Sequence, residues 1–255
     1  MNPQFVTVLG RRLEYIRIPA SKPGLPVLVF LHEGLGSISM WRDFPQRAAE
    51  RTGCEVIVHS RHGYGRSDVI DVPREVRYMH HESQEALPAF FKAIGVDNPV
   101  IVGHSDGASI ALLYAGSGNP AKALVLLAPH VFVEDLSIAG IEAARDAYRT
   151  TDLPKRLGRH HSDVDKTFWA WNNIWLLPAF RDWNIADCLP TVRCPVTVIQ
   201  GYDDEYGTMA QLDAIERQVG GPCELVRLEN CAHSPHRDQS DAVLAVIERV
   251  VASVV

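Results

Sequence analysis

The sequence predicts an α/β fold with a mostly parallel β-sheet flanked by helices, and three observations predict it. Continuous apolar runs recur along the chain, helical patterns separate them, and 255 residues that are 46% hydrophobic are enough to bury a large core. Short apolar runs rich in β-branched residues are typical of strands buried on both faces of a parallel sheet. Their alternation with helices indicates βαβ units.

The expected strands begin with an antiparallel pair. Residues 5–10 and 13–18 alternate loosely between apolar and polar, and we expect a turn at Gly10-Arg11 between them. Six apolar runs follow, the last of them weaker: 26–31, 54–60, 99–105, 122–128, 195–201 and 223–228. Right-handed crossovers would bring the carboxyl ends of the parallel strands to one edge of the sheet, where open α/β sheets bind ligands.

Helical patterns fill the gaps between these runs. They cover 40–51, 75–94, 108–115, 208–219 and 239–251. Pro88 lies inside the second pattern and lacks the N–H that a helix interior needs. We therefore expect a bend or a break in that helix.

One interval, 129–194, is far longer than a crossover requires and follows the sixth strand. It contains helical patterns at 137–150, 162–176 and 178–184, and four of the five tryptophans. A segment of this length is rarely structureless within a compact domain. We predict a helical cap at 131–189, inserted into an α/β core formed by 1–130 and 190–255. The alternative is an ordinary group of surface helices whose tryptophans pack inward.

Composition argues against several classes of protein. Asp and Glu outnumber Lys and Arg by 31 to 25, the formal net charge is −6, and no basic block occurs, so we expect no nucleic-acid partner. No apolar run is long enough to span a membrane, and the first residues lack a signal-peptide pattern. The five cysteines form no CxxC pair, which predicts reduced thiols in a cytoplasmic protein. We expect no metal and no cofactor.

The motif GHSDG at 103–107 is the strongest chemical signal. It matches G-x-S-x-G, follows the apolar run PVIV and precedes the helical pattern at 108–115. This strand-turn-helix context distinguishes a nucleophile turn from a chance match. Ser105 would lie at the head of a helix, where free N–H groups stabilise negative charge. The alternative is a serine that only caps the helix.

A serine hydroxyl needs a base, and the base needs a carboxylate that orients it. His233 follows the last short strand and is the favoured base, with His236 as its rival. Asp204 follows the strand at 195–201 and is the favoured carboxylate, with Asp203 next. The chain order Ser, Asp, His is the order found in α/β-hydrolases.

The tetrahedral intermediate of acyl transfer also needs an oxyanion hole. One donor would be the backbone N–H of Asp106, which follows the nucleophile. The second should come from the loop HEGLGS at 32–37, where we favour Gly34 over Glu33. Loss of one such donor typically lowers the rate by about 10²–10³.

Together these motifs resemble the α/β-hydrolase superfamily, in its capped branch of esterases, lactonases and C–C bond hydrolases. Five motifs occur in the family's order: HEGLGS (32–37), RHGYGRS (61–67), GHSDG (103–107), GYDDEYG (201–207) and NCAHSPH (230–236). Two positions depart from the family pattern. Glu33 replaces the usual glycine after the loop histidine, and Asp106 is an unusual acid beside the nucleophile. A serine at the elbow argues against epoxide hydrolases and haloalkane dehalogenases, which use a carboxylate there.

The resemblance implies an ester or lactone hydrolase of class EC 3.1.1 that works through an acyl-enzyme on Ser105. We expect a small, apolar or aromatic substrate as a partner, no nucleic acid and no membrane, and a homodimer is compatible with the sequence. The expected pocket residues are Glu33, His130, Trp169, Trp175 and His236. A C–C bond hydrolase is the alternative and would need a basic or polar group in the cap to hold a substrate carboxylate, for which the candidates are Arg145, Arg156 and Arg159. A non-catalytic ligand-binding protein is a third hypothesis.

Overall fold

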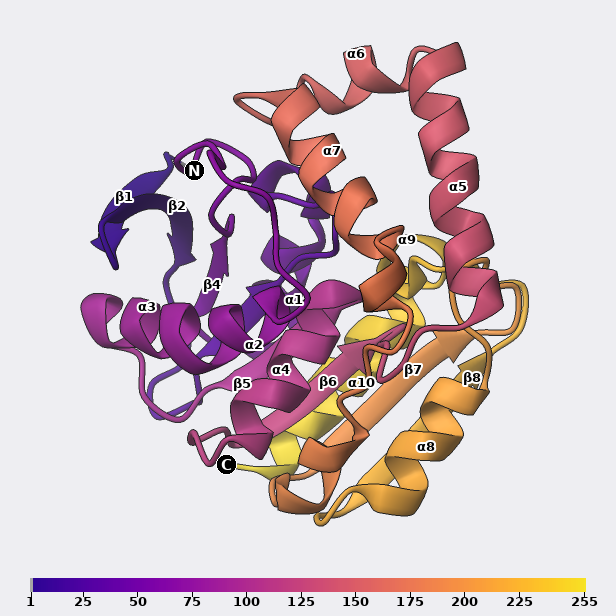
Figure 1. Ribbon diagram of the computed structural model, residues 1–255. Helices are drawn as coiled ribbons and strands as arrows, with labels where there is room; N and C mark the ends of the chain where they lie inside the picture. Colours follow the sequence, from indigo (N-terminus) through magenta and orange to yellow (C-terminus); the bar gives the residue numbers. More distant parts are fainter. Residues whose placement is uncertain (1) are drawn as a thin grey trace.

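Eight strands form one sheet in the computed structural model, which describes residues 2–255 (Figure 1). The strands are β1 (Gln4–Val8), β2 (Arg11–Ile18), β3 (Leu28–Leu31), β4 (Val56–His59), β5 (Val100–His104), β6 (Ala123–Leu127), β7 (Val196–Gly201) and β8 (Cys223–Leu228). Their order across the sheet is β1-β2-β4-β3-β5-β6-β7-β8. Strands β3 to β8 are parallel to one another, and β2 pairs antiparallel with both of its neighbours, β1 and β4. The predicted mostly parallel α/β sheet is confirmed.

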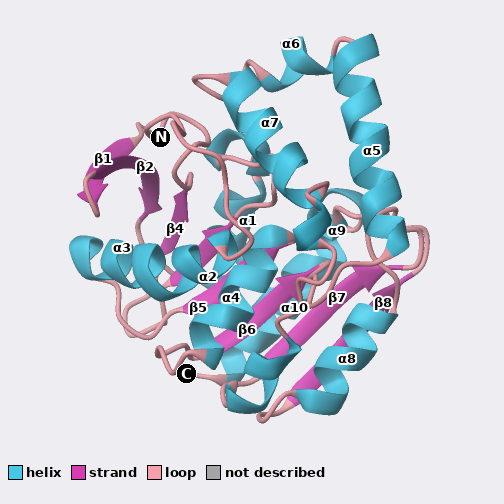
Figure 2. Cartoon of the chain, viewed as in Figure 1, coloured by secondary structure: helices cyan, strands magenta, loops and turns pink. Residues whose placement is uncertain are grey.

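Helices cover both faces of this sheet (Figure 2). One face carries α1 (Phe44–Thr52) and α10 (Ser240–Ser253). The other face carries α2 (Tyr78–His81), α3 (Leu87–Ile94), α4 (Asp106–Gly116) and α8 (Ala210–Gln218). Shorter elements are α9 (Pro235–Asp238) and the 3₁₀ turns Ile38–Trp41, Pro178–Phe180 and Ala186–Thr191. Within residues 2–255, no helix combines the length and apolar character needed to cross a bilayer.

The apolar runs are continuous because each central strand contributes to two cores. In β5, Val100 and Val102 pack in the cluster under α1 and α10, whereas Ile101 packs in the cluster under α4. In β3, Phe30 packs in the cluster under α1 and α10, and Leu31 packs in the cluster under α4. Successive side chains of a strand point to opposite faces, so a strand that is covered on both sides must be apolar at every position.

Two local expectations are corrected in detail. The first turn lies at Leu9-Gly10 and not at Gly10-Arg11, because Arg11 already pairs with Val8 in the β1–β2 ladder. Both turn residues have positive φ, 49° and 76°, as a two-residue hairpin turn of the primed type requires. The irregularity expected at Pro88 is a π-helical turn that joins α2 to α3 just before the proline.

The long interval after β6 is helical. It contains α5 (Asp135–Thr150), α6 (Leu153–Leu157) and α7 (Val164–Trp175) before the chain enters β7. In Figure 1, α5 and α7 project beyond the carboxyl ends of the central strands. The chain therefore has an insertion after the sixth strand, and its action as a movable cap stays a prediction.

Two glycines allow α4 to lie close to the strands that precede it. A Cβ atom on Gly107 would lie 2.2 Å from the carbonyl oxygen of Leu31 in β3. A Cβ atom on Gly103 would lie 2.6 Å from the Cα atom of Ala108. Both distances are far shorter than a carbon atom tolerates, so a side chain at either position would push the neighbouring backbone away.

We expect Gly107→Ala to lower the free energy of unfolding by about 1–3 kcal/mol, because the new methyl group must displace the end of β3. Urea unfolding of the two proteins measures this difference. Gly207→Ala is the matched control, since its Cβ atom would meet no neighbour closer than 3.4 Å. Equal destabilisation by both substitutions would contradict the close-approach argument.

Candidate active site

Ser105 occupies a strained turn between β5 and α4. Its φ and ψ angles are 52° and −119°, a conformation that L-residues rarely adopt. Its N–H donates to the carbonyl oxygen of Leu127 at 2.9 Å, and its own carbonyl accepts from the N–H of Ala108 at 2.9 Å. The Ser105 hydroxyl makes no helix-capping bond. The side chain is therefore held at the helix head without serving as an N-cap.

The side chains of Ser105, His233 and Asp204 form a hydrogen-bonded chain. His233 Nε2 lies 2.9 Å from Ser105 Oγ, and His233 Nδ1 lies 2.8 Å from Asp204 Oδ1. The three residues follow β5, β8 and β7, whose carboxyl ends share one edge because the strands are parallel. The alternative residues lie elsewhere. Asp203 is exposed, and His236 is buried in a separate aromatic cluster.

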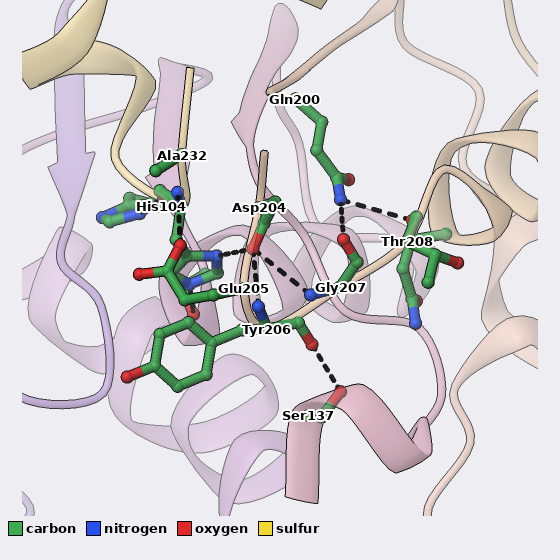
Figure 3. Close-up of polar contacts among 12 residues, drawn as sticks. His104, Ser137, Gln200, Asp204, Glu205, Tyr206, Gly207, Thr208 and Ala232 are labelled. Atoms are coloured by element: carbon green, nitrogen blue, oxygen red, sulfur yellow. Dashed lines mark hydrogen bonds and ion pairs between the residues drawn. The ribbon is translucent and has the colours of Figure 1, made fainter. Parts of the chain in front are cut away.

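Asp204 is held by its own loop as well as by His233. Its Oδ1 accepts hydrogen bonds from the N–H groups of Tyr206 at 2.9 Å and Gly207 at 3.2 Å (Figure 3). Ser137 of α5 donates to the Tyr206 carbonyl at 2.6 Å and so ties this loop to the inserted helices. Burial alone would raise the pKa of Asp204, but the charge and hydrogen bond of His233 and the Tyr206 N–H hold that pKa below its ordinary value. The carboxylate is therefore ionised.

His233 is oriented by contacts to both of its ring nitrogens. A carboxylate only accepts, so Nδ1–H donates to Asp204 and Nε2 is left to accept from the Ser105 hydroxyl. Burial lowers the pKa of His233, but the charges of Asp204, Glu205 and Glu33 outweigh burial and raise the pKa above its ordinary value. This arrangement gives a base of increased proton affinity next to the serine.

The Glu33 carbonyl determines the direction of the neighbouring Gly34 N–H. Three donors bind this carbonyl: His32 Nδ1–H at 2.7 Å, Arg61 Nη2–H at 2.9 Å and the Gly36 N–H at 3.1 Å. In a trans peptide the N–H points opposite to the C=O. The Gly34 N–H is therefore directed away from the buried Arg61, on the side where Gly34 lines the cavity beside Ser105.

Two backbone N–H groups are thus available at the cavity. The Gly34 N–H has no acceptor within residues 2–255. Asp106 is the first residue of α4, so its N–H has no partner inside the helix. Both residues line the same cavity as Ser105. An anionic oxygen bound near the serine could accept from both groups.

The Asp106 side chain neither caps α4 nor forms part of the Ser105–His233–Asp204 chain. Its Oδ2 accepts from the Tyr78 hydroxyl at 2.7 Å and lies 3.9 Å from Arg61 Nη2. Asp106 is only 1% exposed, so these partners compensate for a fully buried acid. Burial and the adjacent carboxylate raise the pKa of Tyr78 well above its ordinary value, which keeps the hydroxyl protonated as a donor.

A cavity of about 110 Å³ opens onto Ser105 and His233. Its side walls include four large apolar residues: Leu35, Ile141, Trp171 and Trp175. The polar contributors include Ser137, Tyr206 and His130. Burial and the neighbouring His233 lower the pKa of His130 to about 3, so its ring is neutral.

Three of the expected pocket residues line this cavity, and two do not. Glu33, His130 and Trp175 are part of the lining, whereas Trp169 and His236 are not. Trp169 packs edge-on against Tyr148 with the ring centroids 5.6 Å apart. His236 is 4% exposed and lies against Trp41 and His104, with ring centroids 4.6 Å and 4.9 Å away.

Helix periodicity explains why Trp171 lines this cavity and Trp169 does not. Positions four apart share one face of a helix, so Trp171 and Trp175 point together into the cavity. Trp169 lies two residues before Trp171 and faces elsewhere. The sequence analysis also missed Tyr206 and Ile141, and only the spacing of the tryptophans carried a signal that could have identified Trp171.

None of the arginines proposed to bind a substrate carboxylate reaches the cavity. Arg145 lies 3.7 Å from Glu142 and 3.5 Å from Asp146, and Arg156 lies 3.1 Å from Asp152. Arg159 is exposed in another surface depression. Among the described residues that line the cavity there is no lysine or arginine.

Comparison with known proteins identifies the family. The sequence profile of the α/β hydrolase family matches residues 28–246, and the chain belongs to this family. A curated relative, the proline iminopeptidase of Lactobacillus delbrueckii subsp. lactis, is 29% identical over 119 residues, which are 46% of this chain and 40% of that protein. The match thus covers less than half of that relative's length.

Solved structures with the same fold cover nearly the whole chain. The proline iminopeptidase of Mycobacterium smegmatis superimposes with a TM-score of 0.78 at 17% identity, over 99% of this chain and 98% of that one. The enol-lactonase from Burkholderia xenovorans LB400 gives a TM-score of 0.75 at 18% identity, over 98% of this chain and 100% of that one. At identities this low, the superpositions show a shared fold and do not identify the substrate of this protein.

We expect Tyr78→Phe to lower the free energy of unfolding by about 1–3 kcal/mol, because the buried Asp106 carboxylate loses its only hydrogen-bond donor side chain at Oδ2. Urea unfolding measures the change. The control is Tyr202→Phe at a residue that is 51% exposed, where we expect almost no effect. A Tyr78→Phe protein as stable as the wild type would show that Arg61 alone compensates for Asp106.

Proposed function

We propose that this protein is a serine hydrolase that cleaves a small, neutral ester or lactone through an acyl-enzyme. The observation that carries the proposal is the chain of hydrogen bonds from Ser105 through His233 to Asp204, at 2.9 Å and 2.8 Å. A serine hydroxyl becomes nucleophilic when an adjacent base accepts its proton. An oriented histidine beside a strained serine is the arrangement that this chemistry requires.

The reaction would proceed in two halves. Ser105 Oγ attacks the ester carbonyl while His233 Nε2 takes the hydroxyl proton, and the resulting oxyanion accepts from the N–H groups of Gly34 and Asp106. His233 then gives its proton to the leaving alkoxide, and the alcohol departs. Water attacks the acyl-enzyme with His233 again as the base, and the acid is released from a restored Ser105. Asp204 stabilises the imidazolium in both halves.

The cavity supports a small and neutral acyl group. Its volume of about 110 Å³ is well below the roughly 300 Å³ at which pockets for drug-sized ligands begin, which suits a short acyl chain. The wall of Leu35, Ile141, Trp171 and Trp175 is apolar. Such a pocket binds uncharged groups, because a charge placed there would lose its hydration without gaining a partner.

The C–C bond hydrolase alternative is less well supported. Its vinylogous diketone substrates carry a carboxylate, and the lining of the cavity offers no cationic side chain to bind it. Glu33, which is part of the lining, would instead repel a second carboxylate. The non-catalytic alternative leaves unexplained why a strained backbone conformation is maintained at Ser105.

We expect p-nitrophenyl acetate and butyrate to be hydrolysed, p-nitrophenyl decanoate to be hydrolysed far more slowly, and an anionic ring-fission diketone to remain uncleaved.

A fluorophosphonate probe should label the wild type and not Ser105→Ala. His233→Ala should lower kcat by roughly 10⁴–10⁶-fold. The control His81→Ala removes an exposed imidazole and should be fully active. A folded wild type that is neither labelled nor active on esters would refute the proposal. Faster cleavage of prolyl-p-nitroanilide than of any ester would indicate a peptidase instead.

We expect kcat/KM to fall as the pH decreases through a midpoint above 6.5, because His233 must be neutral to accept a proton and its pKa is raised above that ordinary value. Asp204→Asn removes the strongest neighbouring negative charge and should move the midpoint to lower pH. It should also lower kcat by about 10⁴-fold through loss of orientation. Rate profiles for both proteins at constant ionic strength test this. An unchanged midpoint in the variant would contradict the role given to Asp204.

A further inference from the structure

We propose that Glu33 is a positioning residue whose carboxylate, acting through His104 and Arg237, holds the chain segment that carries His233. The proposal rests on the proposed function, since positioning matters only if His233 is the base. Glu33 stands where the family pattern has glycine, so a side chain is present at a position that normally has none. Neither its carboxylate nor His104 takes part in the reaction steps above.

The first connection runs through His104. A carbonyl only accepts, so His104 Nε2–H donates to the His233 carbonyl oxygen at 2.7 Å. The other ring nitrogen, Nδ1, lies 3.5 Å from Glu33 Oε2, and the two attract each other when the ring carries a proton on both nitrogens. His104 is 1% exposed and is the last residue of β5, so the sheet fixes its backbone. The His104 imidazole, held by strand β5, thus lies between the loop 32–37, which carries Glu33, and the segment 230–236, which carries His233.

The second connection is direct. Arg237 Nη2 lies 3.8 Å from Glu33 Oε1, and the same nitrogen donates to the Met40 carbonyl at 3.1 Å. Arg237 belongs to α9, only four residues after His233. The Glu33 carboxylate is therefore linked to the 233–237 segment in two ways: its Oε1 faces Arg237 directly, and its Oε2 faces His104, which in turn binds the His233 carbonyl.

The charges around Glu33 keep it anionic. Burial alone would raise its pKa, but the interaction with His104 holds that pKa well below its ordinary value. Burial lowers the pKa of both His236 and His32 well below the ordinary value, so these two rings are neutral. Glu33 itself helps to raise the pKa of His233.

Glu33 therefore contacts the groups that orient both the oxyanion donor Gly34 and the base His233. Its main-chain carbonyl, bound by three donors, sets the direction of the Gly34 N–H. Its side chain faces the groups that hold His233. A displacement of a catalytic group by about 1 Å can lower the rate by roughly 10²-fold. Loss of the Glu33 charge should thus affect the chemical step more than substrate binding.

The test uses Glu33→Gln, which keeps the size of the side chain and removes its charge. On p-nitrophenyl acetate we expect kcat to fall by roughly 10–100-fold with KM nearly unchanged, and the acidic midpoint of the rate profile to move to lower pH. Arg237→Gln, at an exposed residue, tests the second connection without disturbing the core and should lower kcat several-fold. Glu229→Gln, at an exposed acid just before the segment 230–236, is the matched control and should leave kcat, KM and the midpoint unchanged.

A double-mutant cycle with His104→Gln distinguishes positioning from general stabilisation. The side-chain amide that this substitution introduces can still donate to the His233 carbonyl but no longer needs Glu33 to orient it. If Glu33 acts through His104, adding Glu33→Gln to His104→Gln should cost less in kcat than Glu33→Gln costs in the wild type.

Three results would overturn the proposal while leaving the proposed function intact, provided that the fluorophosphonate probe still labels Ser105. They are an unchanged kcat and midpoint in Glu33→Gln, fully additive losses in the cycle, and a raised KM with normal kcat. The last result would mean that Glu33 contacts the substrate directly. Failure of the probe to label wild-type Ser105 would instead refute the proposed function itself.

Discussion

The positive-φ backbone of Ser105 is the constraint on which the whole site depends. Such a conformation costs of order 1–3 kcal/mol and persists only where the surroundings leave no alternative. Here β5 and α4 are both buried, the turn between them is tied to β6 through the Leu127 carbonyl, and glycines at 103 and 107 remove the atoms that would collide. The rigid turn presents the Ser105 hydroxyl and the Asp106 N–H together.

Two buried acceptors near this turn, the Asp204 Oδ1 atom and the Glu33 carbonyl oxygen, are held by hydrogen bonds from residues distant in the chain as well as from their own loops. The Asp204 carboxylate is compensated by His233 and by two N–H groups of its own loop. The Glu33 carbonyl is compensated by three donors, and this sets the direction of the next N–H. A buried polar atom without a hydrogen bond destabilises the fold. The hydrogen bonds that avoid this cost at Asp204 and at the Glu33 carbonyl also orient His233 and the Gly34 N–H for acyl transfer.

Much of the fold followed from pattern alone. Strands β3 to β7 were predictable because they are covered on both faces and must be apolar throughout, and the insertion after β6 was predictable from its length. Two local expectations differ from the structure, one in the cavity lining and one in the first turn. Trp169 was grouped with Trp175 by residue type, although a two-residue offset from Trp171 turns it to another face of α7. The turn at Leu9-Gly10 was shifted by one residue because any loop residue next to the glycine would have fitted the pattern equally well.

The sequence by itself determined the order of strands and helices, the serine turn and the short set of histidines and acids that could serve it. These are local properties, since periodicity and turn chemistry act over a few residues. Only the tertiary structure decided which histidine meets Ser105, which tryptophans line the cavity and what the Glu33 carboxylate faces. His233 is 128 residues from Ser105 and 129 from His104 in the chain. Contacts at such separations depend on how the strands are ordered and packed, and no local pattern contains that information.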